Sequence, residues 1–143
     1  MIVEKLTLED LDQVLEIEKE NFDDPWPSEA FINDINQNSN KELFVLKDGN
    51  VVIGYFDVWY MYDDADLENI AIRKEYQGKG LGEMLLNKCI ERCKEKNVFL
   101  LHLEVKIDNV KAHNLYKKLG FEDVRIRKGY YAGIDGIDMV KRI

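Results

Sequence analysis

The order of apolar and polar positions divides the chain into two kinds of segment. Apolar residues at every second position, or in short continuous runs, predict strands, and apolar residues three and four apart predict helices. The predicted strands cover residues 2–6, 43–46, 51–62, 67–72, 98–105, 122–128 and 135–143. The predicted helices cover residues 8–23, 28–36, 81–96 and 110–119. This order predicts an α+β fold with a mixed central sheet flanked by helices.

Residues that favour helix ends support these boundaries. Thr7, with Asp10 three residues later, is a variant of the capping box, and Ser28 can cap the second helix. The segment 36–40 should end that helix. Asn109 can cap the fourth helix, which Gly120 should stop.

Size and composition favour one soluble domain. The 143 residues suit a single domain, 1–143, and 45% of them are hydrophobic and 34% charged. No stretch reaches the roughly 18 apolar residues of a membrane span, and the N-terminus lacks the basic and apolar regions of a signal peptide. We therefore expect a cytoplasmic protein. The strand at 98–105 is so apolar that we expect both of its faces to be buried.

The formal net charge of −8 disfavours nucleic acid as a partner, because phosphate backbones require a basic surface. A cationic partner fits better. Acidic residues concentrate in the middle of the chain, at Asp57, Asp63, Asp64, Asp66 and Glu68. The simplest interpretation of this segment is a solvated strand edge and loop.

Cys89 and Cys93 lie four residues apart on a predicted helix, a spacing at which side chains share a face but seldom form a disulfide. They are not a Cys-x-x-Cys pair, and neither His102 nor His113 completes a zinc ligand set. We expect no metal site and interpret both cysteines as buried small hydrophobic residues.

Gly78, Gly80 and Gly82 lie between a predicted strand and a predicted helix. Such a turn leaves the first N–H groups of the helix unpaired at the positive end of the helix dipole, which makes an anion site. A side chain at Gly78 or Gly80 would hold a diphosphate too far from these amides. Lys79 can add a positive charge.

Two nucleotide-binding motifs fit this stretch poorly. A Walker loop needs Ser or Thr after Gly-Lys, but Gly80 follows Lys79. The dinucleotide fingerprint needs a third glycine where the chain has Glu83 or Leu85. Glu104, about 20 residues further on, would suit the ribose-binding acid of that fingerprint, which keeps it as a weaker alternative.

The segment Gln77-Gly78-Lys79-Gly80-Leu81-Gly82 resembles the Gln/Arg-x-x-Gly-x-Gly/Ala signature of the GNAT N-acetyltransferases, whose strand, loop and helix bind the diphosphate of acetyl-CoA. The predicted order of strands and helices matches that fold. Further stretches resemble the RimI-type branch of the family: NFDDPWPSEAF, NIAIRKEYQGKGLGEMLL, LEVKIDNVKAHNLYKKLGF and RKGYYAGIDGIDMVK. They span nearly the whole chain in the expected order.

This resemblance implies acetyl-CoA as co-substrate and a protein N-terminus as acceptor. In the bacterial prototype of the branch, the acceptor is a small-subunit ribosomal protein that begins with alanine. A basic ribosomal protein would suit an enzyme with a charge of −8.

The resemblance also assigns site residues. Ile70, Ala71 and Ile72 would present strand backbone groups to the thioester and the pantetheine arm. The loop around the diphosphate would comprise Gln77, Gly78, Lys79, Gly80, Leu81, Gly82 and Glu83, and Asn109 would contact the cofactor from the next helix. Glu104 falls on the proton acceptor of the family and Tyr116 on its proton donor.

The chemistry of an amine acceptor agrees with an N-terminus. At pH 7 an α-amine near pKa 7.8 costs only about 1 kcal/mol to deprotonate, whereas a lysine near 10.4 costs about 4.6 kcal/mol. A carboxylate is a weak base for this task unless burial raises its pKa or a water relays the proton. Glu104 ends an apolar strand, where we expect it to be buried. Asn109 and Tyr116 are two helical turns apart and should share a face.

Each of these residues has a simpler interpretation. Tyr116 belongs to the apolar stripe of its helix and can be a core aromatic residue, Asn109 can be only a cap, and Glu104 can be a surface carboxylate.

Three aromatic residues are candidates for contact with the acceptor. Trp26, between two prolines, either anchors a loop on the core or lines a peptide groove. Tyr130 and Tyr131 either pack at a strand edge or form a wall for the first residues of the substrate.

Three functions follow from these patterns. The leading hypothesis is an N-acetyltransferase that transfers an acetyl group directly from acetyl-CoA to a protein N-terminus. The second keeps the fold and cofactor but has a small polyamine as acceptor, motivated by the acidic segment 57–68. The third is a non-catalytic acyl-CoA-binding module that acts through a protein partner.

Overall fold

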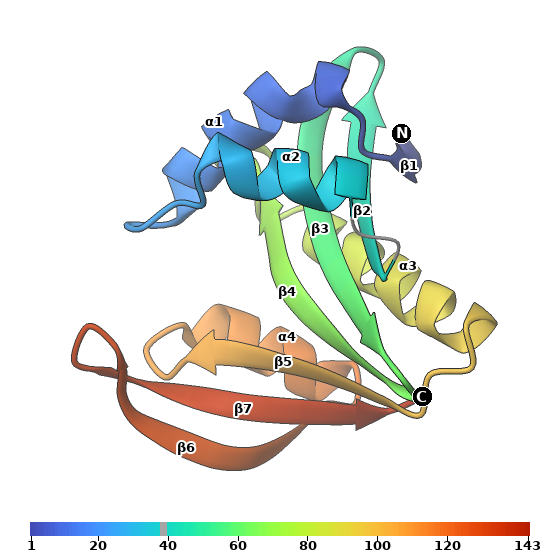
Figure 1. The fold of residues 1–143 in the computed structure, drawn as a ribbon. Helices are drawn as coiled ribbons and strands as arrows, with labels where there is room; N and C mark the ends of the chain where they lie inside the picture. Colours follow the sequence, from blue (N-terminus) through green and yellow to red (C-terminus); the bar gives the residue numbers. More distant parts are fainter. Residues whose placement is uncertain (38–39) are drawn as a thin grey trace.

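A single mixed sheet organises the computed structural model, which describes residues 1–37 and 40–143 (Figure 1). Its strands are β1 (Ile2–Lys5), β2 (Lys41–Asp48), β3 (Val51–Met61), β4 (Asp64–Ile72), β5 (Leu100–Lys106), β6 (Glu122–Tyr131) and β7 (Ile134–Arg142). Their order across the sheet is β1-β2-β3-β4-β5-β7-β6. Neighbouring strands are antiparallel, except that β4 and β5 run parallel. The predicted α+β class and mixed sheet are confirmed.

Helices cover both faces of this sheet. They are α1 (Leu11–Asn21), α2 (Ser28–Gln37), α3 (Leu81–Glu95) and α4 (Val110–Lys118), with 3-10 turns η1 (Leu8–Asp10) and η2 (Lys74–Tyr76). Helices α1 and α2 lie on one face, and α3 and α4 lie on the other (Figure 1). Within the described residues, none of the helices is both long and apolar enough to cross a membrane.

The predicted helix ends are largely confirmed. Thr7 and Asp10 form a capping box, although it opens η1 rather than α1 directly. Asn109 accepts a hydrogen bond from the N–H of Ala112 at 3.2 Å, and Gly120 follows α4 with a φ of +95°. The end predicted for the second helix at 36–40 falls partly on residues 38–39, outside the described residues.

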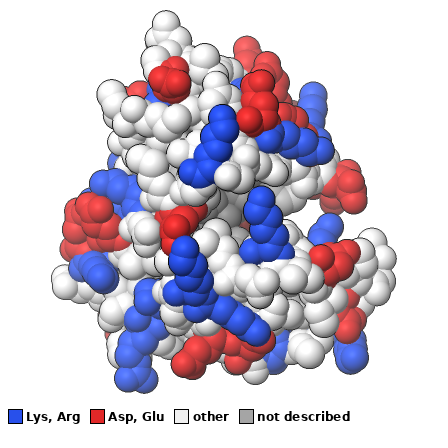
Figure 2. All heavy atoms as spheres, turned by 180° about the vertical axis from the view of Figure 1, so that it is seen from behind, with Lys and Arg blue, Asp and Glu red and all other residues white. Residues whose placement is uncertain are grey.

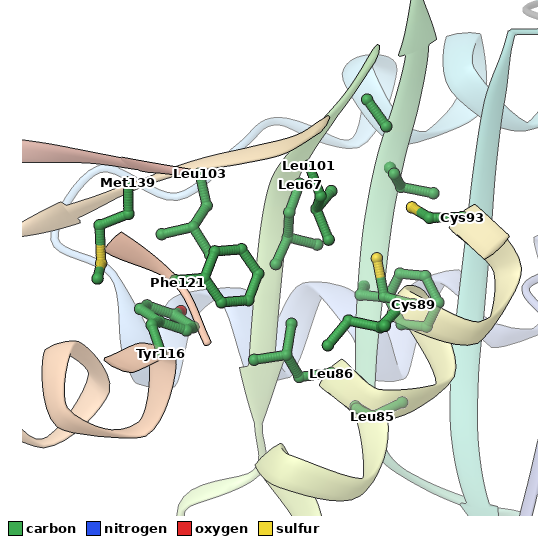
Figure 3. Close-up of a cluster of buried hydrophobic side chains, with 14 of the residues drawn as sticks. Leu67, Leu85, Leu86, Cys89, Cys93, Leu101, Leu103, Tyr116, Phe121 and Met139 are labelled. Atoms are coloured by element: carbon green, nitrogen blue, oxygen red, sulfur yellow. The ribbon is translucent and has the colours of Figure 1, made fainter. Parts of the chain in front are cut away.

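Side chains of the central strands alternate between two cores, one under each helix layer. Val45 and Tyr55 belong to the core beneath α1 and α2, whereas Phe56 belongs to the core beneath α3 and α4. Cys89 and Cys93 are free and buried in the second core, as predicted (Figure 3).

Strand β4 diverges from its neighbour β5 after its first three residues (Figure 1). Only these residues, 64–66, pair with β5. The register of β4 against β3 then shifts between Asp57 and Val58. Their partners are Asn69 and Leu67, so Glu68 between these two is the extra residue of a bulge. The rest of β4, residues 67–72, therefore has a free edge where a parallel neighbour would otherwise lie.

The prediction that both faces of the fifth strand are buried is wrong. Leu101, Leu103 and Val105 are buried, but the alternate residue Glu104 is exposed. The reason is the divergence of β4, which leaves the second face of β5 open to a cavity rather than covered by a helix.

The acidic segment is a solvated edge and loop only in part, because Asp63 and Glu68 are exposed whereas Asp57 is not. Asp64 and Asp66 belong to β4, which begins before the predicted residue 67. Asp57 is fully buried in β3. It lies two residues after Tyr55 and therefore on the same face of the sheet, which α1 and α2 cover.

Neither carboxylate oxygen of Asp57 has a hydrogen-bond partner among the described residues. Burial is the main cause that raises the pKa of Asp57 from 3.8 to about 8. The nearby carboxylates of Asp34 and Glu68 act in the same direction, while Lys41 opposes them. Between about pH 4 and pH 8 the folded protein thus keeps a proton that the unfolded chain has released, so this group makes folding less favourable as the pH rises.

We predict that Asp57→Asn, which mimics the neutral acid, gains stability over the parent protein as the pH rises from 5 to 8. The gain should be about 1 kcal/mol or more in the free energy of unfolding, measured by urea denaturation at both pH values. Asp63→Asn, at an exposed position, is the matched control and should show no such gain. A constant difference between Asp57→Asn and the parent would contradict the buried, protonated carboxyl.

Candidate active site

The chain enters α3 through a turn that exposes backbone donors. Gly78 and Gly80 have left-handed conformations, with φ of +80° and +79°, and a Cβ at either position would meet nothing within 4 Å. Gly80 is the N-cap of α3 and brings no side chain to cap it. The N–H groups of Leu81, Gly82 and Glu83 make no hydrogen bond to another described residue. Unpaired donors therefore lie beside open space, as an anion site requires.

A cavity of about 350 Å³ adjoins this turn. Of the predicted cofactor-binding residues, it is lined by Ile70, Ala71, Ile72, Gln77, Gly78, Gly80, Leu81, Gly82, Glu83 and Asn109. Tyr116, the predicted proton donor, lines it as well. Lys79 does not line it, and its Nζ lies 5.3 Å from the centre of the Tyr76 ring. Figure 2 views the face that carries α3 and α4, where Lys and Arg side chains stand around a central hollow.

Side chains from two other segments close the far end of the free β4 edge. The carbonyl oxygen of Ile72 accepts hydrogen bonds from the amide groups of Asn21 at 3.0 Å and Gln77 at 2.9 Å. Gln77 also donates to the Asn21 side-chain oxygen at 2.9 Å. Asn21 lines the cavity and was missed by the sequence analysis, although it lies on the same face of α1 as buried Ile17, four residues earlier.

The backbone of β4 presents alternate residues to this edge. The Arg73 N–H donates to the Ile53 carbonyl on β3 at 2.7 Å, whereas the Ile72 carbonyl points away from β3. Because successive residues of a strand direct their N–H and C=O groups to opposite sides, Ile70 and Ile72 face the free edge and Ala71 faces β3. Two of the three predicted strand residues therefore offer backbone groups to a ligand.

Charges at the cavity are arranged to tolerate an anion. Glu83 lies in the first turn of α3, but the Lys118 ammonium lies 3.0 Å from its carboxylate and offsets its charge. Lys111, at the beginning of α4, adds a positive charge to the lining and was not predicted. Asn109 combines both of its expected roles, because it caps α4 and also lines the cavity.

Tyr116 is both a core residue and a cavity residue. It is 9% exposed and packs against Phe121, with ring centres 5.9 Å apart, close to Met139 (Figure 3). Its hydroxyl makes no hydrogen bond to the other described residues. Burial raises the pKa of Tyr116 to about 12, so the hydroxyl stays protonated at neutral pH and can act as a donor.

A second cavity, of about 860 Å³, lies between β4, β5, β6 and β7. It brings together the predicted proton acceptor and the three predicted substrate residues: Glu104, Trp26, Tyr130 and Tyr131. Strand β4 contributes residues 66–68 to this cavity and residues 70–72 to the first one. Since two residues of a strand span only about 7 Å, the two cavities approach each other at the free edge of β4.

The expectation that Glu104 is buried is wrong, because 34% of its side chain is accessible. Its carboxylate accepts a hydrogen bond from the Tyr131 hydroxyl at 3.3 Å and lies 3.8 Å from Arg127 Nε. Burial, followed by the charge of Glu104, raises the pKa of Tyr131 above its ordinary value. Glu104 and Tyr116 therefore lie in different cavities, on either side of β4.

Comparisons with known proteins agree with this geometry. Residues 11–121 match the family model described as the acetyltransferase (GNAT) family. A Bacillus subtilis protein, provisionally named a ribosomal protein bS18-alanine N-acetyltransferase, is 41% identical over 90% of this chain and 85% of its own length. A Haemophilus influenzae protein named ribosomal protein bS18-alanine N-acetyltransferase is 39% identical over 91% of this chain and 87% of its own.

A solved structure has the same fold. The crystal structure of the ribosomal-protein-S18-alanine N-acetyltransferase from Escherichia coli superposes with a TM-score of 0.91 at 32% identity, covering 99% of this chain and 93% of the other. The family match spans more than half of the chain and includes the strand, turn and helix that form the first cavity. The protein therefore belongs to the acetyltransferase (GNAT) family.

Proposed function

We propose that the protein transfers the acetyl group of acetyl-CoA to the α-amine of a protein N-terminus, and that the acceptor is a ribosomal protein that begins with alanine. The observation that carries this proposal is the pair of cavities that meet at the free edge of β4. In a direct transfer both substrates must be bound at once, with the acceptor amine next to the thioester carbon, so each needs its own path to that point. The names of the relatives from Haemophilus influenzae and Escherichia coli support the choice of acceptor.

The first cavity suits the cofactor. Acetyl-CoA supplies the acetyl group as a thioester. The unpaired N–H groups of Leu81, Gly82 and Glu83 bind its diphosphate, and the positive end of the α3 dipole strengthens this contact. Ile70 and Ile72 hold the pantetheine arm by their backbone groups, and an N–H from this edge donates to the thioester oxygen as it gains negative charge.

Glu104 and Tyr116, which line different cavities, carry out the two proton transfers. The acceptor amine must be neutral before it forms the new N–C bond, and Glu104 takes its proton directly or through a water. Tyr116 provides the proton that the sulfur takes up as the C–S bond breaks. The raised pKa of Tyr116 keeps that proton on the hydroxyl until then. Trp26, Tyr130 and Tyr131 form the walls around the first residues of the acceptor.

Neither alternative function is favoured. The polyamine hypothesis was motivated by the acidic segment 57–68, of which Asp57 is buried while Asp66 and Glu68 line the second cavity. The names of the relatives from Haemophilus influenzae and Escherichia coli favour a protein N-terminus over a polyamine as the acceptor. A purely acyl-CoA-binding module would not need a second cavity lined by an accessible carboxylate. We expect residues 1–143 to act as one domain, in the cytoplasm, on a protein rather than on nucleic acid or a membrane.

The acceptor is tested by incubating the protein with acetyl-CoA and peptides that begin with Ala, Ser, Met or Lys. We predict that mass spectrometry finds one acetyl group on the Ala peptide, the acceptor that the names of the relatives favour. The acetyl group should be on the α-amine, because an α-amine is easier to deprotonate than a lysine side chain. The same peptide with a blocked N-terminus and an internal lysine is the control. Thiol release with spermidine, together with no acetylation of any peptide, would contradict the proposed acceptor.

We predict that Glu104→Gln and Tyr116→Phe each lower kcat by roughly 10²–10⁴-fold, the usual contribution of a positioned acid or base. The Kd of acetyl-CoA should change by less than about 3-fold, because neither substitution removes a diphosphate donor. Steady-state kinetics and calorimetry measure the two effects. Glu122→Gln and Tyr62→Phe, at exposed positions, are the matched controls. Unchanged turnover in both site variants would favour a non-catalytic module.

Two glycines of the turn make a matched pair. Gly80→Ala places a side chain at a φ of +79°, so the turn must shift, and we predict at least roughly 10-fold weaker binding of coenzyme A. In Gly82→Ala the new Cβ lies 3.9 Å from both Ile72 Cγ1 and Leu115 Cδ2, an ordinary contact. This variant should bind coenzyme A within a few-fold of the parent and gain about 0.5–1 kcal/mol in stability. Equal affinities for both variants would count against the turn as the diphosphate site.

A further inference from the structure

Glu18 is a buried carboxylate that the proposed chemistry does not use. It lies on α1, is 1% exposed, and forms no ion pair with any of the described residues. Three donors from three separate elements meet on it. They are the Tyr55 hydroxyl of β3, the Asn69 side-chain amide of β4, and the backbone N–H of Trp26 at 2.8 Å.

Stability alone does not account for an acid at this position. Burying a carboxylate without a neighbouring cation is costly, and the three hydrogen bonds offset that cost rather than turn it into a large gain. Val14 and Ile17 on the same helix show that the surrounding face is apolar and tightly covered. A hydrophobic residue could fill this face without the desolvation cost of a carboxylate. We therefore look for the role of Glu18 in the three segments that its hydrogen bonds join.

The three donors connect the two substrate cavities. Asn69 directly precedes Ile70, whose backbone faces the free edge of β4. Trp26 lines the second cavity, and its ring packs on Phe31 with centres 5.5 Å apart. Asn21, one turn after Glu18, binds the Ile72 carbonyl at the other end of the same edge. The end of α1 thus contacts β4 at Asn69, just before the residues that face the cofactor, and at Ile72, the last of them.

The loop at residues 22–27 has few other means of attachment at its tip. Pro25 and Pro27 have no backbone N–H, so Trp26 supplies the only such donor in the segment 25–27. That donor binds Glu18. Glu18 therefore holds the backbone at the tip of this loop, while the ring of Trp26 packs on Phe31.

We propose that Glu18 is a positioning residue for the acceptor. It fixes the loop that carries Trp26 against β4, and so sets the distance between the wall of the acceptor cavity and the edge that presents the thioester. The inference rests on the proposed function for the meaning of the two cavities. The tether itself can be measured without any acceptor.

The first test is Glu18→Gln, which keeps the size of the side chain but removes its charge and brings an NH₂ group to a point where donors already converge. The KM for the acceptor peptide should rise by about 10-fold, while the Kd of coenzyme A changes by less than about 2-fold. Glu9→Gln, at an exposed glutamate earlier in the chain, is the control and should change neither value. An equal loss of coenzyme A affinity would overturn the proposal.

A double-mutant cycle with Trp26→Ala separates positioning from general destabilisation. If Glu18 acts through the loop, Glu18→Gln should raise the acceptor KM by less than about 2-fold once the Trp26 side chain is gone. Effects that simply multiply would contradict the proposal. Should Glu18→Gln fail to fold, Tyr55→Phe removes one of the three donors while its ring stays against Phe31, and the acceptor KM should rise by about 3-fold. An unchanged KM in Tyr55→Phe would then overturn the proposal.

Hydrogen exchange gives a result that is independent of the reaction. The amide of Trp26 should exchange at least about 10-fold faster in Glu18→Gln than in the parent protein, while the amides of α3 are unchanged. Unchanged exchange at residues 22–27 would overturn the tether even if acetylation is observed. Absence of acetyl transfer in the parent protein would instead refute the proposed function and leave the exchange result intact.

Discussion

Strand β4 loses its neighbour β5 after its first three residues, and the arrangement of the site follows from that loss. A buried strand edge must satisfy its N–H and C=O groups, because each unpaired group costs about 1–3 kcal/mol. After the bulge at Glu68, strand β5 no longer satisfies them. Asn21 and Gln77 satisfy the carbonyl of Ile72, and the backbone groups of Ile70 remain available to a ligand. The glycine turn places the first residues of α3, with their unpaired N–H groups, at the same cavity.

Local signals in the sequence were sufficient for the elements and for the glycine turn that borders the first cavity. Some residues act through their own backbone conformation or their own capping hydrogen bond. They are Gly78, Gly80, Asn109 and Gly120. The residue type at each of these positions is therefore enough to predict the turn or helix end that it forms. The resemblance to acetyltransferases added the strand residues 70–72, Gln77 and the cofactor role of Asn109. It also added Tyr116 and Glu104, for which spacing alone favoured simpler interpretations.

The errors arose where distant segments meet. Asp57 lies in an apolar run like that of any buried strand, and only the packing of α2 on β3 determines that its carboxylate is buried. Glu104 is exposed because β4 diverges from β5, and the point at which it diverges depends on the pairing between strands. Glu18 and Asn21 were recognisable only as polar residues next to the apolar face of α1. Each has a hydrogen-bond partner on β4 that is 51 residues away in the sequence.

The most direct test of the account is an NMR titration of the ¹⁵N-labelled protein with coenzyme A, followed through its backbone amides. We predict that the largest chemical-shift changes occur at Leu81, Gly82 and Glu83 and at the free-edge residues Ile70 and Ile72. Saturable binding that leaves these amides unperturbed, with the changes located elsewhere, would contradict it.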